Sequence, residues 1–497
     1  MPKRLVQDLG RPFEVDLDRA TPLPMYLQIC RRFKTAIEQG HLKPGDRVPS
    51  ARALAAELSV ARGTVDMAYR ILADEGYVQV RGAAGTVISP TLPVRAATGE
   101  APLVDPATHP THIDHDGNLP KPLQMGLPAL DAFPRKVWNR LVGHRLRSGD
   151  VSRLAYPHPA GFGPLRERIA TYLGVSRGVR CVPEQVFITT GLRASLELAL
   201  SSLSTAGDAF WFEDPGYILA RPFLLNTGLE IVPVPVDRQG LQVDEGIRLA
   251  PHARFAMVTP SHQSPLGVTL SLERRMALLD WASRAGSWII EDDYDSEFRY
   301  QGRPLPALKS LDRHDRVIYS GTFSKVMFPG LRLAYVVAPL SVVDRFEAVA
   351  FNLNAGCPFL FQAGVADFMA EGHFSRHLKK MRVLYAERRA VTQRVFNQLL
   401  ADTLRIDLLP GGLHVLANMP DAVDDAALAT HVRAAGLAAN PLSPWYMAAP
   451  PKKGLLLGFA NIVDEDDATR VARRLRQALS VGADVPVSSA PRRGSRS

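Results

Sequence analysis

The sequence predicts a multidomain protein in which a small N-terminal winged helix-turn-helix domain, α-helical with a β-wing, precedes a larger α/β domain. Short helical patterns and two β-rich runs fall within residues 21–89, and prolines recur over 90–122. Helical and β-rich runs then alternate, which is typical of a parallel α/β sheet. We therefore expect a linker over 90–122, an α/β domain over 123–480 with a smaller subdomain at roughly 361–480, and a disordered tail over 481–497.

The composition of the 497 residues, 46% hydrophobic and 22% charged, is that of a soluble globular protein. No apolar stretch is long enough to span a membrane, and acidic residues interrupt the first twenty positions. We therefore expect no signal peptide and a cytoplasmic location. The three cysteines, Cys30, Cys181 and Cys357, have no metal-ligand spacing, so neither a disulfide framework nor a metal site is predicted.

The elements of the first domain follow from apolar spacing and helix signals. Apolar residues at three- and four-residue intervals predict a helix over 25–37. Ser50 is a candidate N-cap for a short second helix, and a third helix follows a tight turn and carries the apolar positions of 65–72. Two short β-rich runs, 77–80 and 86–88, flank a glycine-containing loop and predict a hairpin, or wing.

Basic and hydroxyl side chains stand where this arrangement meets a DNA duplex. The second helix of a helix-turn-helix enters the major groove with its N-terminal residues, while basic residues reach phosphates. Arg62 and Thr64 begin that helix, Arg52 begins the preceding one, and Arg81 lies on the wing. Any one of these arginines is more often a solvated surface residue, but their joint placement favours DNA binding.

The run HLKPGDRVPSARALAAELSVARGTVDMAYRILADEGYVQVRGAAGTVIS resembles a GntR-type winged helix along nearly its whole length. The resemblance implies a double-stranded DNA operator as partner. The contacts that it implies are Arg52, Arg62, Thr64, Arg81 and Gly82. Ala61 and Gly63 stand where such domains often have hydroxyl residues, and Asp66 stands where some have a basic one, which bears on the operator sequence.

A second group of residues suits a phosphorylated cofactor. Lys325 follows a Ser/Thr-rich run that begins at Ser320, and Arg332 comes seven residues later, so an amine, hydroxyls and a guanidinium are close in sequence. The segment 190–193 opens a helix after a β-rich run and offers backbone N–H groups to a phosphate. A lone lysine after serine is usually a surface residue, so this motif is weak by itself.

A carboxylate and a phenol follow the β-rich run 288–290. Asp292 and Tyr294 therefore emerge together at the C-terminal end of a strand, where α/β sites form. A carboxylate there can hold a pyridinium nitrogen protonated, and a phenol can bond a ring oxygen. Paired acids after a strand are more often solvated loop residues, and it is the order of all these motifs in one α/β domain that favours a site.

That order resembles the fold type I, aspartate-aminotransferase-like superfamily from about Leu123 to Leu479. The resemblance implies pyridoxal 5'-phosphate, with Lys325 as the Schiff-base lysine, Asp292 on the pyridine nitrogen and Tyr294 on the ring hydroxyl. The residues implied around the phosphate are Gly191, Leu192, Arg193, Ser320, Thr322 and Arg332. Tyr217 looks like the aromatic that stacks on the ring, its alternative being a core tyrosine, and Gln263 stands in a loop that usually carries an asparagine.

A winged helix fused to such a domain is the architecture of MocR/GabR-type transcription regulators. The runs EDDYDSEFRY and SGTFSKVMFPGLRLAY of this chain closely resemble the signatures of that family. This resemblance implies a homodimeric regulator that binds pyridoxal phosphate and senses a small amine, an amino acid or the cofactor itself, with Tyr156 near the partner's site. An active aminotransferase with a vestigial DNA module is the alternative. Leu456 stands where such enzymes commonly carry a carboxylate-binding arginine, for which Arg221 is a possible substitute, so little or no turnover is expected.

Overall fold

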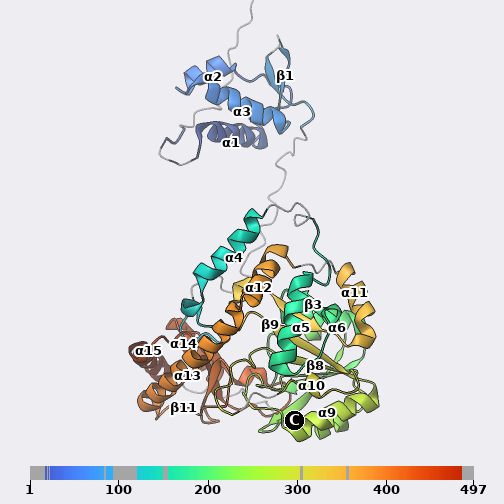
Figure 1. The fold of residues 1–497 in the computed structure, drawn as a ribbon. Helices are drawn as coiled ribbons and strands as arrows, with labels where there is room; N and C mark the ends of the chain where they lie inside the picture. Colours follow the sequence, from blue (N-terminus) through green and yellow to red (C-terminus); the bar gives the residue numbers. More distant parts are fainter. Residues whose placement is uncertain are drawn as a thin grey trace, which may run out of the picture. The chain divides into compact units, whose positions relative to one another are not determined.

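The computed structural model describes residues 17–19, 21, 23–82, 85–92, 120–148, 155–302, 306–353 and 357–483. The chain divides into two compact units, Met1–Gly117 and Asn118–Ser497 (Figure 1). Residues 93–119 of the predicted linker and 484–497 of the predicted tail lie outside the described residues. Among the helices that are described, none is both long and apolar enough to cross a membrane.

The N-terminal unit is a winged helix-turn-helix, as predicted. Its elements are α1 (Met25–Glu38), α2 (Ala51–Glu57), α3 (Arg62–Asp74), β1 (Val78–Val80) and β2 (Thr86–Ile88). The Ser50 hydroxyl caps α2 by accepting a hydrogen bond from the Ala53 N–H at 3.2 Å. Phe33, Leu54 and Leu72 meet in a core that is closed to solvent, so the three helices hold one another in place. The wing is an antiparallel pair in which Val78 lies opposite Ile88.

The larger unit contains an eight-stranded sheet in the order β3-β10-β9-β8-β7-β4-β5-β6. Its strands are β3 (Val186–Thr189), β4 (Ala209–Asp214), β5 (Glu230–Asp237), β6 (Gly240–Leu241), β7 (Phe255–Val258), β8 (Trp288–Asp293), β9 (Val317–Thr322) and β10 (Ala334–Val337). The central pairs from β5 to β9 are parallel, but β10 is antiparallel to both β9 and β3. The predicted parallel sheet is thus mixed, because the short β9–β10 connection has no crossover helix, which parallel neighbours need.

Helices cover both faces of this sheet. The helices up to α11 are α4 (Arg135–Arg147), which packs on α12 (Phe359–Ala370), and α5 (Gly163–Arg177), α6 (Leu192–Leu203), α7 (Arg221–Leu225), α8 (Val243–Leu249), α9 (Leu272–Ala285), α10 (Leu308–Leu311) and α11 (Val343–Asn352). Alternate strand residues enter opposite cores: Phe210 and Phe212 of β4 pack with α6 and α11, while Trp211 packs with α9. Both faces are therefore buried, as a largely parallel sheet requires.

A smaller antiparallel sheet follows, in the order β11-β12-β14-β13. The remaining elements are α12 (Phe359–Ala370), α13 (His373–Leu400), β11 (Arg405–Ile406), β12 (His414–Asn418), α14 (Asp425–Ala434), β13 (Asn440–Pro441), β14 (Gly454–Gly458) and α15 (Glu465–Ala483). The bridge between Leu123 and Gly458 joins the start of this unit to β14.

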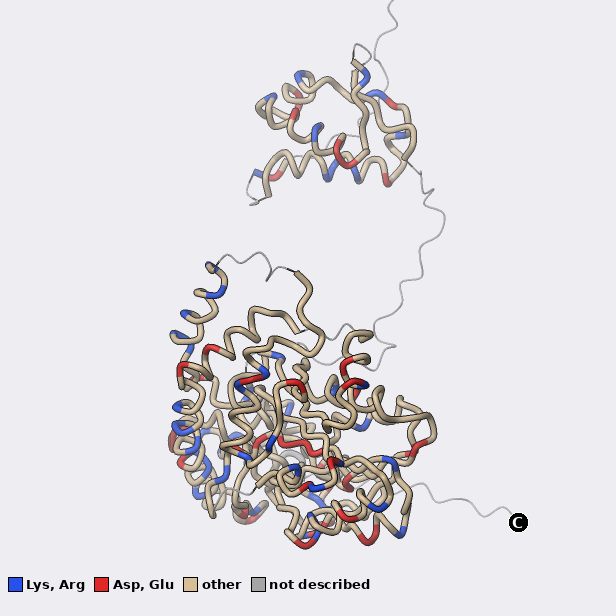
Figure 2. Tube along the Cα trace, turned by 45° about the vertical axis from the view of Figure 1, so that its right-hand side comes forward, with Lys and Arg blue, Asp and Glu red and all other residues tan. Residues whose placement is uncertain are grey.

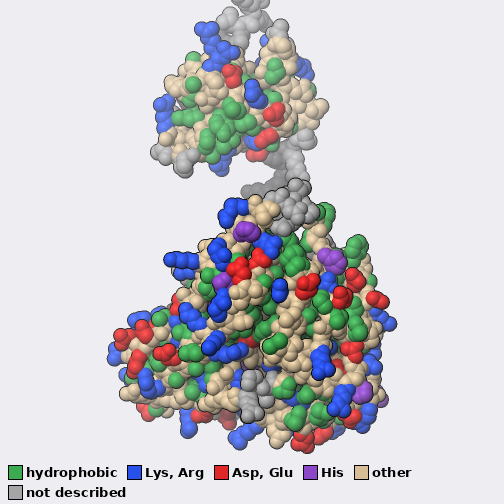
Figure 3. Space-filling model, in the orientation of Figure 1, with side chains coloured by type: hydrophobic (Ala, Val, Ile, Leu, Met, Phe, Trp, Pro, Cys, Tyr) green, Lys and Arg blue, Asp and Glu red, His purple; other side chains and the backbone are tan. Residues whose placement is uncertain are grey.

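Charged residues are distributed over both units. Along much of the backbone, Lys and Arg are interspersed with Asp and Glu, whereas α4 carries Lys and Arg without any Asp or Glu (Figure 2). On the face of the surface drawn in Figure 3, basic, acidic and hydrophobic side chains are likewise mixed.

Candidate functional site

The predicted DNA contacts lie on three neighbouring features of the N-terminal unit. Arg62 is the first residue of α3, and its side chain is 71% exposed beside Asp66, with 3.4 Å between Nε and Oδ2. Thr64 lies in the first turn of α3, Arg52 is exposed in the first turn of α2, and Arg81 is exposed directly after β1. This arrangement leaves the side chains that begin α3 free to enter a groove.

The wing turns at two glycines. Gly82 has a φ of 54° and Gly85 a φ of 84°, a backbone region that favours glycine. The N–H of Arg81 donates to the carbonyl of Gly85 at 2.8 Å, which closes the turn. The predicted contacts Arg81 and Gly82 therefore stand at the tip of a defined hairpin.

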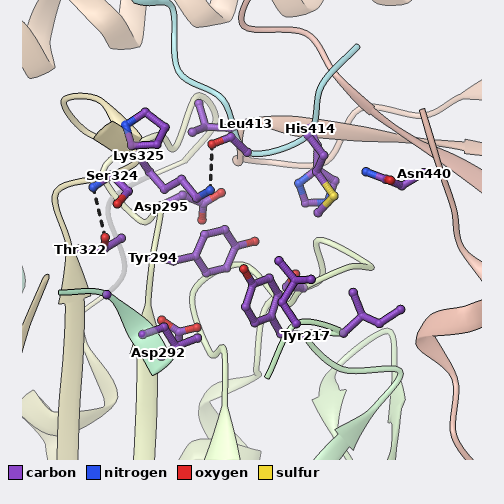
Figure 4. Close-up of a pocket in the computed structure, with 18 of the residues that line it drawn as sticks. Tyr217, Asp292, Tyr294, Asp295, Thr322, Ser324, Lys325, Leu413, His414 and Asn440 are labelled. Atoms are coloured by element: carbon purple, nitrogen blue, oxygen red, sulfur yellow. Dashed lines mark hydrogen bonds between the residues drawn. The ribbon is translucent and has the colours of Figure 1, made fainter. Parts of the chain in front are cut away.

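The larger unit holds a pocket of about 450 Å³. Of the residues predicted for a cofactor, the structure brings nine into its lining: Gly191, Leu192, Tyr217, Asp292, Tyr294, Ser320, Thr322, Lys325 and Arg332. They come from the ends of β8 and β9, the start of α6 and the loop after β4. Figure 4 shows Lys325, Asp292, Tyr294 and Tyr217 around the same space.

Two predicted residues take other places. The exposed guanidinium of Arg193 lies over the ring of Phe223, 5.6 Å from its centroid, and its side chain does not line the pocket. The buried amide of Gln263 donates to Glu213 at 3.2 Å and to the carbonyl of Pro215 at 2.8 Å. Gln263 therefore ties its loop to the end of β4, behind the pocket.

Lys325 lies in the pocket with its amine held by the backbone. Its Nζ donates to the carbonyl oxygen of Gly126 at 2.8 Å. Burial lowers the pKa of this amine, against the opposing effects of Asp295 and Asp292. A lower pKa raises the fraction of neutral amine, the form that attacks a carbonyl carbon.

Gly126 makes this placement possible. A Cβ at this position would lie 2.5 Å from the Lys325 Nζ, and the φ of the residue is 73°. Sequence reasoning missed Gly126, because nothing near it in the chain marks it as a neighbour of a lysine 199 residues away.

One end of the pocket, called here the anion-binding end, has groups that suit an anion. Gly191 precedes α6 with a φ of 144°, and a Cβ there would lie 3.4 Å from Nη2 of Arg332. The first turn of α6 carries no acidic side chain, so its N–H groups and helix dipole favour an anion. The hydroxyl of Ser320 joins the lining there, and that of Thr322 accepts from the Ser324 N–H at 3.1 Å.

A carboxylate lines the pocket at the end of β8. Burial, together with the neighbouring acids Asp293, Asp295 and Glu213, raises the pKa of Asp292 to about 8. A cation placed beside Asp292 would favour its ionised form. The residue thus suits a partner that carries a proton on a ring nitrogen.

Tyr294 belongs to a buried network that the sequence did not reveal. Its hydroxyl lies 2.9 Å from Nδ1 of His262, and the same nitrogen lies 3.2 Å from Oδ2 of Asp295. The ring of His414 stands 5.3 Å from that of His262. The adjacent positions Ser261-His262-Gln263 and Asp295 were the available signals, since both flank predicted site residues.

Tyr217 and Tyr156 differ in exposure. Tyr217 lines the pocket, with its ring 6.3 Å from that of Trp445, and burial raises its pKa to about 12. Tyr156 is 94% exposed.

Among the residues that the structure describes, no group of three His, Cys, Asp or Glu side chains could hold a metal.

Comparison with known proteins assigns each unit to a family. Residues 25–88 match bacterial regulatory proteins of the gntR family, and residues 136–443 match aminotransferase class I and II. The chain is 39% identical over 456 residues to the probable rhizopine catabolism regulatory protein MocR of Rhizobium meliloti, covering 90% of this chain and 92% of that protein. It is 32% identical over 476 residues to the HTH-type pyridoxine biosynthesis transcriptional regulator PdxR of Corynebacterium glutamicum, covering 94% and 99%.

A solved structure supports the fold of the larger unit. LysN, an α-aminoadipate aminotransferase from Thermus thermophilus complexed with N-(5'-phosphopyridoxyl)-L-leucine, matches with a TM-score of 0.66 and 28% identity. The match covers 73% of this chain and 92% of that one. The larger unit thus has the fold type I architecture that the sequence predicted.

Proposed function

Because this chain belongs to the MocR/GabR-type helix-turn-helix transcription regulators, we propose that it binds pyridoxal 5'-phosphate at Lys325 and alters its DNA binding when a small molecule enters the same pocket. Domains of the aminotransferase class I and II family typically bind this cofactor. The winged helix implies operator binding, for which Arg52, Arg62, Thr64, Arg81 and Gly82 are the proposed contacts.

The observation that carries the proposal is the set of groups that meet in the pocket. The amine of Lys325, the carboxyl group of Asp292 and the pair Gly191 and Arg332 all line it. This set fits pyridoxal phosphate, whose ring carries a nitrogen, an aldehyde opposite that nitrogen and a phosphate arm next to the aldehyde. When bound, the cofactor supplies an aldehyde carbon that reacts reversibly with primary amines.

Each remaining pocket residue has a proposed task in holding that group. Arg332, Ser320, Thr322 and the N–H groups that begin α6 would hold the phosphate. Tyr217 would pack on the ring, and Tyr294, oriented by His262, would bond the ring hydroxyl. Arg193 contributes through its backbone N–H, and Gln263 through the position of its loop.

Operator binding is proposed to require a homodimer. Paired half-sites on a duplex match the twofold symmetry of a dimer. The exposed Tyr156 is a proposed contributor to the partner's pocket. A dimer would also link two pockets to one operator.

Two alternative functions predict different results in the same assay. An active aminotransferase is favoured by the joint presence of Lys325, Asp292 and Tyr294 in one pocket, and it requires keto acid formation from an amino donor. In a sensor of the cofactor itself, the cofactor alone would change operator affinity.

The test compares the full chain with Lys325→Ala. We expect the wild type to gain visible absorbance with pyridoxal phosphate and to change operator affinity when an effector is added. Lys325→Ala should lose that absorbance while keeping operator binding in the absence of effector. Equal absorbance in both proteins would refute the Lys325 assignment, and keto acid formation would favour the enzyme.

A further inference from the structure

The half of the pocket that faces away from the anion-binding end is apolar. Its wall is built from the segment before α4, the loops after β4 and before β12, and the residues around β13: Met125, Ile218, Leu219, Leu413, Pro441 and Trp445. The polar side chains in this wall are those of Asn440 and His414 (Figure 4). A ligand that reaches this region exchanges water for hydrocarbon contacts.

This wall offers no positive charge. Among the described residues that line the pocket, the lysines and arginines are Lys325 and Arg332, and Arg332 stands beside Gly191 at the anion-binding end. His414 is buried, with its Nε2 3.0 Å from the carbonyl oxygen of Pro265. Burial lowers its pKa to about 4, so the imidazole is neutral near pH 7.

Arg221, named above as a substitute for the missing carboxylate-binding arginine, turns its guanidinium into the protein. Nη2 of Arg221 donates to the carbonyl oxygens of Trp445 at 2.6 Å and of Pro444 at 3.1 Å, and Arg221 does not line the pocket. Leu456 is fully buried in a cluster with Leu442 and Trp445 behind the wall. The bidentate partner that a carboxylate prefers is therefore missing from the described lining.

The charges that do reach the pocket favour a cation. Asp292 and Asp295 both line it, and both act on the amine of Lys325. An ionised carboxyl group here repels a carboxylate, and a protonated one gives it no positive charge to pair with. Placing an unpaired carboxylate against the apolar wall would also cost desolvation energy that no hydrogen bond restores.

We propose that the effector of this chain is a primary amine with an apolar body and no α-carboxylate. This inference rests on the proposed function, since it names the chemical class that the cofactor pocket accepts. The amine would lie near Lys325 and Asp295, and its body would pack against Ile218, Leu413 and Trp445.

The experiment uses matched pairs that differ by one carboxylate: isopentylamine against leucine, phenylethylamine against phenylalanine, and tyramine against tyrosine. The cofactor-loaded full chain is titrated with each compound, following calorimetric affinity, visible absorbance and operator affinity. We expect at least one amine to bind about tenfold or more tightly than its amino acid, a difference of about 1.4 kcal/mol. The preferred amine should also be the compound that changes operator affinity.

Two variants add a positive charge at different distances from the pocket. Asn440→Arg places a guanidinium in the wall and should reduce the preference for amines at least threefold. Val175→Arg adds the same charge on the exposed surface of α5, where Val175 is 88% exposed, and should leave the preference as in the wild type. If Asn440→Arg does not fold, the wild-type pairs still decide the question.

Two results would overturn the inference. The first is equal or tighter binding of the amino acids in all three pairs. The second is a Lys325-dependent absorbance that no amine alters. Either would leave cofactor binding at Lys325 intact, whereas failure of the proposed function would appear as the absence of that absorbance.

Discussion

Substitution of Gly126 by alanine tests how the pocket positions its lysine. The φ of Gly126 is 73°, and the added Cβ would lie 2.5 Å from Nζ of Lys325. To restore ordinary contact at 3.4 Å, the amine must move by about 0.9 Å. The long lysine side chain can make that movement, but it then leaves its hydrogen bond to the Gly126 carbonyl.

Two separate effects follow from this substitution. A side chain in the left-handed backbone region costs about 1–2 kcal/mol of folding free energy. Misplacing a reacting group by about 1 Å can lower a covalent reaction rate by about a hundredfold. We therefore expect Gly126→Ala to remain folded and to react with pyridoxal phosphate about tenfold to a hundredfold more slowly.

Gly286→Ala is the matched control. Gly286 has a φ of 69°, close to that of Gly126, but a Cβ there would meet nothing within 4 Å. Both variants should show a similar decrease in the free energy of unfolding in urea. Only Gly126→Ala should show a slower increase in absorbance after the cofactor is added. Equal cofactor reactivity in the two variants would refute the role assigned to Gly126.

Three further predictions concern DNA binding and stability. Arg62→Ala should weaken operator binding and reduce its salt slope by about 1, whereas Arg168→Ala on α5 should change neither in a fluorescence anisotropy titration. The raised pKa of Asp292, about 8, means that only the unfolded chain ionises this carboxyl freely between about pH 4 and 8. The free energy of unfolding of the cofactor-free protein, measured with urea, should therefore fall as the pH rises through this range. Asp292→Asn should make this fall smaller. An unchanged dependence of the unfolding free energy on pH in Asp292→Asn would contradict the prediction. Nε of Arg177 lies 2.8 Å from Oδ2 of Asp293, and both side chains are buried. Arg177→Met should therefore lower the free energy of unfolding, measured by chemical denaturation, by about 3–5 kcal/mol. A decrease below about 1 kcal/mol would contradict the role of this buried ion pair.

Local periodicity was sufficient to predict most elements that build the pocket. The helix expected to open at 190–193 begins at Leu192, and the β-rich run 288–290 forms the first half of β8. Both are determined by apolar spacing within a few residues. The antiparallel direction of β10 was missed, because strand direction depends on how the chain returns to the sheet and not on the pattern of the strand itself.

The cofactor half of the pocket and its apolar half differ in how the chain builds them. Lys325, Asp292 and Tyr294 come from contiguous motifs at the ends of two neighbouring strands, so a short run of sequence places each of them. Gly126, Leu413 and Asn440 come from distant segments, and they meet Lys325 only because β12 and β14 pair and hold them near the strand ends.

This difference has a physical consequence for recognition. A change at Asn440 or Leu413 alters the wall that meets a ligand without touching the strand ends that hold Lys325 and Asp292. The chemistry of the cofactor and the choice of effector are therefore carried by separate parts of the fold. Motifs in the sequence can predict the first, whereas the second depends on charge and shape that appear only when the smaller sheet is placed beside the larger one.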